Sequence, residues 1–256
     1  MGQRAKAAVG AVLGSRAVGR VVGTLFHDRV PHGGCIIDTS APDVMPETKA
    51  RIFTRLYENP ELRCVERYLR RDLDVVELGS SLGVLSCHIS RRLLPQVRLI
   101  CIEAHPALGA VIDRNLRANT PDRDFRVLHR AIHYGGEPAV RLQFGDETMR
   151  GKIANKSAPA TVESSLVPAS TLSEVLDEVG LHKDYALVAD IEGAEVWIIV
   201  EDAPALQRCR QLVIELHKTE YKGRDYTIDD LAHELQERYG FRVRARDGDV
   251  WVFDRD

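Results

Sequence analysis

An acidic residue and two glycines stand at fixed spacing between a buried strand and an amphipathic helix. The apolar run 73–78 predicts the strand; Glu77 lies near its end, and Gly79 and Gly83 follow. A glycine-bearing turn lets a ligand approach bare backbone, and the helix N-terminus offers free N–H groups. The stretch is typical of the first crossover of a nucleotide-binding α/β sheet.

The spacing of the glycines bears on which nucleotide would bind. A dinucleotide fold needs Gly-x-Gly-x-x-Gly, but Ser81 and Val84 occupy its second and third positions here. The carboxylate of Glu77 would repel a pyrophosphate, whereas it could pair with the amino group of a methionine moiety. The motif therefore favours S-adenosylmethionine (SAM) over NAD. A tight turn without a ligand, as in any doubly wound sheet, is the plainer interpretation.

Two further acids end predicted buried strands. Glu103 ends the run 97–103, where an acid commonly accepts hydrogen bonds from ribose hydroxyls, although it could simply cap the next helix. Asp190 ends the run 185–190, where burial is costly without a partner or ligand, although aspartate also favours helix N-caps. The cofactor-binding set that we expect is Glu77, Gly79, Ser81, Gly83, Glu103, Ala104, Ala131, Ile132 and Asp190.

His217 follows the last predicted parallel strand, and we expect it to be catalytic together with Asp190. Methyl transfer to an alcohol requires removal of a proton, and histidine titrates in a suitable range. An exposed histidine at a strand end is the simpler alternative. Asp190, Glu215 and His217 could instead hold Mg²⁺ through oxygen-rich ligands, but no dense carboxylate cluster demands a metal. Metal-free proton abstraction therefore ranks first.

Composition indicates an ordinary globular protein. The 256 residues are 44% hydrophobic and 29% charged, and the net charge of −3 gives no electrostatic footprint for nucleic acid. The five cysteines are scattered, and no pair has zinc-ligand spacing. We read them as thiols in a reducing compartment, which places the protein in the cytoplasm.

Strands alternate with helices from Leu73 onward, which predicts parallel pairing and right-handed crossovers. Five strands are expected at 73–78, 97–103, 125–128, 185–190 and 211–216. The helix after Gly193 is expected to run to about Arg208. Asp247-Gly248 between two apolar runs predicts a final antiparallel hairpin.

Residues 1–70 are predicted to form a helical segment and substrate-side cap, and residues 71–256 a methyltransferase domain with an insert at about 133–170. Residues 1–30 read as an amphipathic helix, too interrupted by Arg16 and Arg20 for a membrane span. Packing on its own domain or on a second copy is favoured over peripheral membrane contact through residues 1–28. Residues 27–47 and most of the insert read as loops, with a strand at 140–144.

The chain resembles the FkbM-type SAM-dependent methyltransferases from about Thr48 to its C-terminus. The sharpest segment is 190–195, Asp-Ile-Glu-Gly-Ala-Glu, and Ser80 and Ser81 stand where Ala-Asn is common in the family. The other matching segments are 55–58, 77–83, 102–106, Asn115 with Asn119, 167–172 and 215–217.

The resemblance implies an α/β fold with a seven-stranded Rossmann-like sheet, and SAM-dependent methyl transfer to a hydroxyl oxygen. The acceptor would be a hydroxylated small molecule such as a sugar, glycolipid, polyketide or similar secondary metabolite. A homodimer is compatible with the sequence. Two alternatives stay open: a non-catalytic SAM-binding module, and a nucleotide-dependent oxidoreductase, which the missing glycines disfavour.

Overall fold

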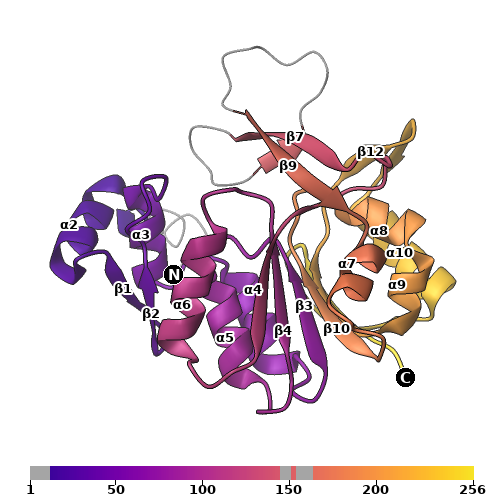
Figure 1. Ribbon diagram of the computed structural model, residues 1–256, viewed down its shortest axis with the longest axis horizontal. Helices are drawn as coiled ribbons and strands as arrows, with labels where there is room; N and C mark the ends of the chain where they lie inside the picture. Colours follow the sequence, from indigo (N-terminus) through magenta and orange to yellow (C-terminus); the bar gives the residue numbers. More distant parts are fainter. Residues whose placement is uncertain (1–11, 145–150, 154–163) are drawn as a thin grey trace, which may run out of the picture.

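A seven-stranded sheet forms the centre of the computed structural model, which describes residues 12–144, 151–153 and 164–256 (Figure 1). Its strand order is β14-β15-β11-β10-β3-β4-β5. The inner strands run parallel, and β15 is antiparallel to both of its neighbours. The expected seven-stranded Rossmann-like sheet with a C-terminal antiparallel hairpin is thus confirmed. The bounds are β3 Asp74–Leu78, β4 Leu99–Glu103, β5 Phe125–His129, β10 Tyr185–Ala189, β11 Cys209–Glu215, β14 Arg242–Asp247 and β15 Val250–Asp254.

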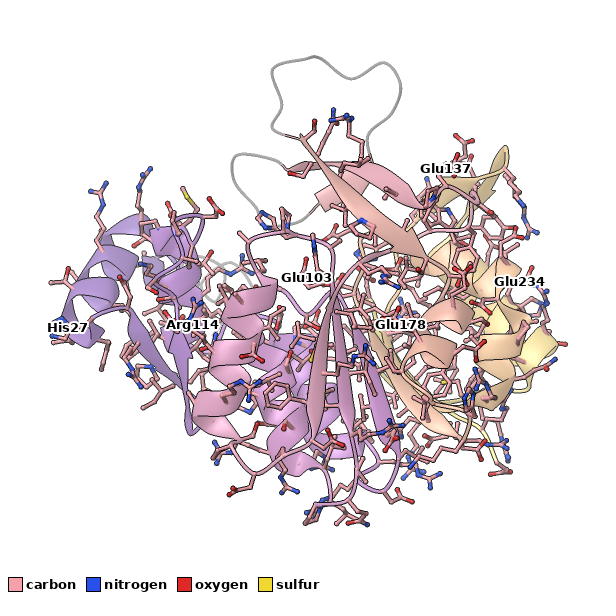
Figure 2. The ribbon with its side chains drawn as sticks, viewed as in Figure 1. His27, Glu103, Arg114, Glu137, Glu178 and Glu234 are labelled. Carbon is pink, nitrogen blue, oxygen red and sulfur yellow. The ribbon has the colours of Figure 1, made fainter. Side chains whose placement is uncertain are left out.

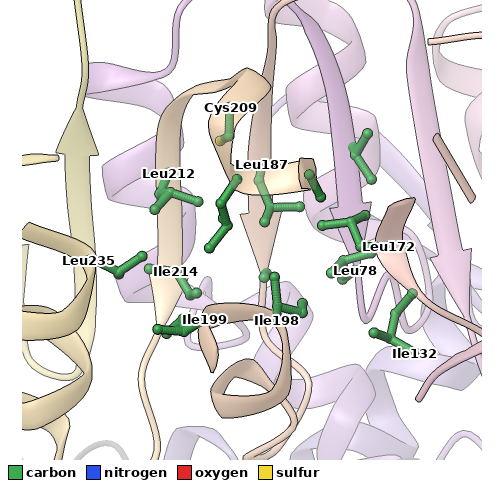
Figure 3. Close-up of a cluster of buried hydrophobic side chains, with 14 of the residues drawn as sticks. Leu78, Ile132, Leu172, Leu187, Ile198, Ile199, Cys209, Leu212, Ile214 and Leu235 are labelled. Atoms are coloured by element: carbon green, nitrogen blue, oxygen red, sulfur yellow. The ribbon is translucent and has the colours of Figure 1, made fainter. Parts of the chain in front are cut away.

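Helices cover both faces of this sheet because its strands are apolar on both sides. Alternation sends Val75 toward one helical layer and Val76 toward the other, so two hydrophobic clusters form. Figure 3 shows part of the cluster that contains Val76 and Leu78. One layer is α4 Asn59–Tyr68, α5 Val84–Arg92 and α6 Gly109–Asn119, and the other is α7 Leu172–Glu178, α8 Glu195–Glu201, α9 Ala203–Arg208 and α10 Ile228–Tyr239.

Local sequence signals explain where these helices begin. Thr171 and Thr227 each form a capping box. The threonine hydroxyl accepts from the N–H of the third helical residue, and the carboxylate of that residue accepts from the threonine N–H. The single helix expected between Gly193 and Arg208 is wrong, because it is divided into α8 and α9. Asp202 ends α8 and caps α9 by accepting from the Ala205 N–H, with Pro204 in the first turn.

The N-terminal segment contains a β-hairpin where a loop was expected. Its elements are α2 Arg16–Phe26, β1 Arg29–His32, β2 Cys35–Asp38 and α3 Pro46–Phe53. Gly33 and Gly34 form the hairpin turn with φ of 55° and 85°, a conformation that glycine adopts without strain. Val30 and Ile37 join the same hydrophobic cluster as Val75 of the central sheet. The division of the chain into two parts near residue 70 stays a prediction. This hydrophobic cluster contains residues from both sides of that boundary.

Helix α2 packs against α3 through its small residues. Gly19, Val22 and Gly23 are buried, whereas Val21 and Leu25 are 65% and 67% exposed. Among the described residues, no helix combines the length and apolar character needed to cross a bilayer. Packing on the same chain accounts for one face of the helix. Membrane contact and dimerisation through the exposed face stay predictions.

The insert forms a four-stranded sheet in the order β6-β9-β7-β8, which projects at the top of Figure 1. The strand expected at 140–144 is present as β7 Ala139–Phe144. The loop expected after it is wrong at β8 Gly151–Ile153 and β9 Ser164–Ser170; residues 145–150 and 154–163 lie outside the described residues. β6 Ala131–Ile132 pairs with β9 rather than extending the main sheet, and a hairpin of β12 Thr219–Tyr221 and β13 Arg224–Tyr226 follows β11.

Candidate active site

The turn after β3 closely approaches the end of β10. The Asp190 N–H donates to the Leu78 carbonyl at 3.1 Å. Gly79 has φ of 82°, and a side chain there would place its Cβ 2.0 Å from the Asp190 carbonyl oxygen. Gly83, with φ of 76°, begins α5, and its Cβ would lie 3.3 Å from Ile112. Both positions therefore favour glycine, because each has a positive φ and a close neighbour where a Cβ would lie.

Glu103 lies at the carboxyl end of β4, where Figure 2 labels it. Its Oε2 accepts from the Ser81 N–H at 2.7 Å, and its Oε1 accepts from the His105 N–H at 2.6 Å. Burial raises the pKa of this carboxyl, while the backbone donors act against that rise. A carboxylate has about four lone-pair sites, so the bonds to the N–H groups of Ser81, Ala104 and His105 still leave capacity for a ribose hydroxyl. The structure thus brings Ser81 and Glu103 together as a cofactor site requires.

Glu77 points into the core rather than into the open edge. It is 2% exposed, and its Oε2 accepts from the hydroxyls of Ser80 and Ser86 and from the Cys101 thiol. Burial raises the pKa of Glu77 to about 7, although these donors oppose the rise. The carboxyl therefore holds the two ends of the β3–α5 turn. Its predicted direct contact with a methionine amino group stays a prediction.

The remaining predicted cofactor residues lie around the same edge. Ser81 has φ of 49°, and its hydroxyl lies 2.8 Å from the Tyr57 hydroxyl, which connects the segment before α4 to the turn. Ala104 follows β4, and its carbonyl oxygen lies 3.0 Å from His129 Nε2. Ala131 and Ile132 are buried in β6, where Ala131 packs against β7 and β9 residues.

His217 lies among carboxylates beyond the end of β11. Its Nδ1 is 3.3 Å from Glu195 Oε1, and its Nε2 is 3.9 Å from both Asp190 Oδ1 and Glu215 Oε1. Contact with Glu195, opposed by burial and assisted by the other two charges, raises the pKa of His217 to about 9. The imidazole therefore carries a proton at neutral pH in this arrangement. Asp190 and His217 are adjacent, as their strand-end positions predicted.

Glu195 is a site residue that the sequence did not single out. It is fully buried, and its Oε1 and Oε2 accept from the N–H groups of Ile191 and Gly193 at 2.8 and 2.9 Å. The carboxylate thereby fixes the turn that presents Asp190. An acid at the start of α8 also interacts favourably with the helix dipole. The sequence alone therefore could not distinguish that role from bonding to the turn.

Two acids from the start of α4 also reach this edge. One carboxylate oxygen of Glu61 lies within 4.8 Å of one from Asp190 and one from Glu215. Glu58 stands next to them: burial, with the charges of Glu61, Glu77 and Asp190, raises its pKa well above the usual range. A second group with the same spacing comprises Asp190, Glu192 and His217. The sequence did not associate Glu61 with the strand-end acids.

Comparison with known proteins identifies the family. Residues 86–243 match the model of the methyltransferase FkbM domain. The chain belongs to this family. SAM is its cofactor, and the glycine turn after β3 with Glu103 bonded to it fits that ligand. The resemblance to the FkbM family that the motifs indicated is thereby confirmed. The methyltransferase class and SAM as methyl donor are confirmed with it.

Solved structures with a similar fold include Sp1610 of Streptococcus pneumoniae in complex with SAM, at 13% identity over 76% of this chain and 71% of that one, with a TM-score of 0.46. A ribosomal protein L11 methylase from Lactobacillus delbrueckii subsp. bulgaricus is 12% identical over 77% of each chain, with a TM-score of 0.42. Precorrin-6y C5,15-methyltransferase from Geobacter metallireducens GS-15 is 16% identical over 77% and 86%, with a TM-score of 0.42. The search of curated proteins gave no match.

Proposed function

We propose that this FkbM-family methyltransferase is an O-methyltransferase that acts in the cytoplasm on a hydroxyl of a small molecule. The acceptor class is a sugar, glycolipid, polyketide or similar secondary metabolite. The observation that carries the proposal is that His217 lies 3.9 Å from Asp190, whose backbone packs directly on the glycine turn at Gly79. A site that methylates oxygen must remove a proton, and these two groups stand where the acceptor would meet the cofactor.

When bound, SAM supplies an electrophilic methyl group on a sulfonium. Glu103 and the glycine turn after β3 would hold and orient SAM. Glu77 stabilises the conformation of that turn through its hydrogen bond from Ser80. Methyl transfer to an acceptor hydroxyl would release the hydroxyl proton, and the Asp190–His217 pair would take it up. His217 must first release the proton that its carboxylate neighbours stabilise. Most of the rate enhancement comes from alignment of the reacting atoms.

His217→Asn is expected to lower kcat about 10²- to 10³-fold, because loss of a positioned acid–base group has that order of effect. SAM affinity should stay within about twofold, since the residue is assigned to proton transfer rather than to cofactor binding. Turnover would be followed with methyl-labelled SAM and small-molecule extracts of the source organism, and affinity by calorimetry. The matched control is His233→Asn on the exposed side of α10.

Two outcomes would contradict the proposal. Full turnover by His217→Asn would remove the assigned base. Label found on nitrogen, carbon, protein or RNA instead of on a small-molecule oxygen would overturn the reaction class. A chain that binds SAM but labels nothing in any fraction would instead be the non-catalytic SAM-binding module.

A further inference from the structure

One buried acid and two partly buried acids, from three separate elements, converge beside the proposed acceptor site. Glu61 comes from the first turn of α4, Asp190 follows β10 and Glu215 ends β11. One carboxylate oxygen from each lies within 4.8 Å of those from the other two. Three carboxylates at such spacing repel one another in a partly dehydrated site, and His217, at 3.9 Å from Asp190 and Glu215, offsets only part of that repulsion.

Glu61 gives an independent reason to expect a ligand. The residue is only 7% exposed, and its Oε2 is buried without a hydrogen-bond partner among the described residues. Glu58, one turn earlier, also has a buried Oε2 with no partner in the same part of the chain. Burying an unsatisfied carboxylate oxygen is costly, so native proteins give such an atom a donor, a proton or a cation.

We propose that Glu61, Asp190 and Glu215 form a binding site for one hard divalent cation of the Mg²⁺ class. Three carboxylate oxygens are the ligand type that Mg²⁺ and Mn²⁺ prefer, and water or an acceptor hydroxyl can complete the coordination. The neighbouring set of Asp190, Glu192 and His217 includes an imidazole, which suits softer metals better. The all-oxygen set is therefore the one we assign.

The cation would place positive charge beside the reacting oxygen of the acceptor, a role that rests on the proposed O-methyl transfer. The sequence favoured proton abstraction without a metal, so the proposed cation site departs from that expectation. The sequence showed only Asp190, Glu215 and His217 near one another. Glu61 lies more than a hundred residues earlier, and only the docking of α4 against β11 brings it to the same edge.

The test is direct titration of the full-length protein with Mn²⁺, followed by electron paramagnetic resonance of the free ion, with Mg²⁺ as competitor. One Mn²⁺ per chain is expected, and Glu61→Gln should weaken its binding at least tenfold. Glu66→Gln, the same change at an exposed position of the same helix, should leave binding unchanged. Circular dichroism would check folding, and Glu215→Gln provides a second ligand variant with the same expected loss.

The result is independent of turnover, so it separates this site from the proposed reaction. No Mn²⁺ uptake by the wild-type protein would overturn the assignment, and so would equal uptake by Glu61→Gln. Loss of binding in His217→Asn with retention in Glu61→Gln would place the ion on the other set and overturn it as well. Failure of O-methylation alongside intact Mn²⁺ binding would contradict the function and leave the metal site standing.

Discussion

At the scale of single residues, the structure separates acids that face the cofactor edge from one that supports it. Glu103 lies at the edge with both oxygens on backbone N–H groups, whereas Glu77 is enclosed by two serines and a cysteine. Strand alternation already places Glu77 on the α5 face, two residues from Val75. The site therefore combines an acid at the end of β4, bonded to backbone N–H groups, with an acid that sets the shape of the turn.

Glu77 should make the stability of the protein depend on pH. Its pKa is about 7 in the folded chain against an ordinary value of 4.5, because burial disfavours the charged form. The folded protein therefore gains stability from holding Glu77 protonated. This contribution is fully present below about pH 4.5 and is lost as the pH rises through 7. The difference in pKa corresponds to about 3 kcal/mol of unfolding free energy.

Glu77→Gln cannot ionise but retains an oxygen that accepts from the serine hydroxyls. Urea unfolding would measure the free energy of unfolding of both proteins between pH 5 and pH 8. It should fall with rising pH by up to about 3 kcal/mol more in the wild-type protein than in the variant. Groups with a shifted pKa that do not interact with Glu77, such as His217, contribute equally to both proteins and cancel. Parallel curves for the two proteins would show that Glu77 is not the titrating group.

At the scale of elements, the strength of local signals decided which predictions succeeded. The Asp247-Gly248 hairpin was predicted correctly because its signal depends on neighbouring residues alone. The strand β9 was not readable, since Ser164–Ser170 contains Pro168 and lacks an alternating pattern, and pairing with β7 and β6 stabilises it. The β12–β13 hairpin was missed although Lys222-Gly223 offered a turn signal.

The contact between α2 and α3 depends on the absence of a side chain at Gly19. A Cβ there would lie 1.6 Å from the Pro46 carbonyl oxygen, and backbone at the start of α3 cannot yield as a flexible side chain would. Gly19→Val should therefore detach α2 and lower the unfolding free energy by about 2 kcal/mol or more, the range seen for overpacking. Ala17→Val, on the exposed side of the same helix, is the control.

Thermal unfolding and limited proteolysis would measure this effect. Cleavage should increase within residues 12–45 of Gly19→Val, while SAM binding at the distant turn should change little. Equal proteolysis of the two valine variants would argue that α2 is held by other contacts. The same proteins, tested for flotation with anionic vesicles, would show whether Val21 and Leu25 bind lipid.

At the scale of the whole molecule, the N-terminal segment and the cofactor turn are joined by one buried side chain. Asn115 of α6 accepts from the Asp38 N–H at 2.7 Å and donates to the Leu82 carbonyl at 2.9 Å. Leu82 lies in the glycine turn, and Asp38 ends the β1–β2 hairpin. The sequence showed an asparagine in this helix but not its partners, because both lie more than thirty residues away.

Asn115→Ala tests whether the N-terminal hairpin and the cofactor turn are energetically coupled. The change leaves the Leu82 carbonyl and the Asp38 N–H without their partner, which should cost about 2–3 kcal/mol of unfolding free energy. Because Leu82 belongs to the turn, SAM affinity should also fall, by about tenfold if 1.4 kcal/mol of the loss reaches the site. Calorimetry with SAM and urea unfolding would measure the two effects separately.

Asn119→Ala supplies the matched comparison on the same helix. Asn119 bonds the Ile36 N–H and carbonyl of the hairpin, and its bonds do not reach the turn. It should lower stability while SAM affinity stays near that of the wild-type protein. If both variants bind SAM equally well, the hairpin is a structural support alone. If only Asn115→Ala loses affinity, the N-terminal segment helps to shape the cofactor site, because the two asparagines share the hairpin and differ in the contact with Leu82.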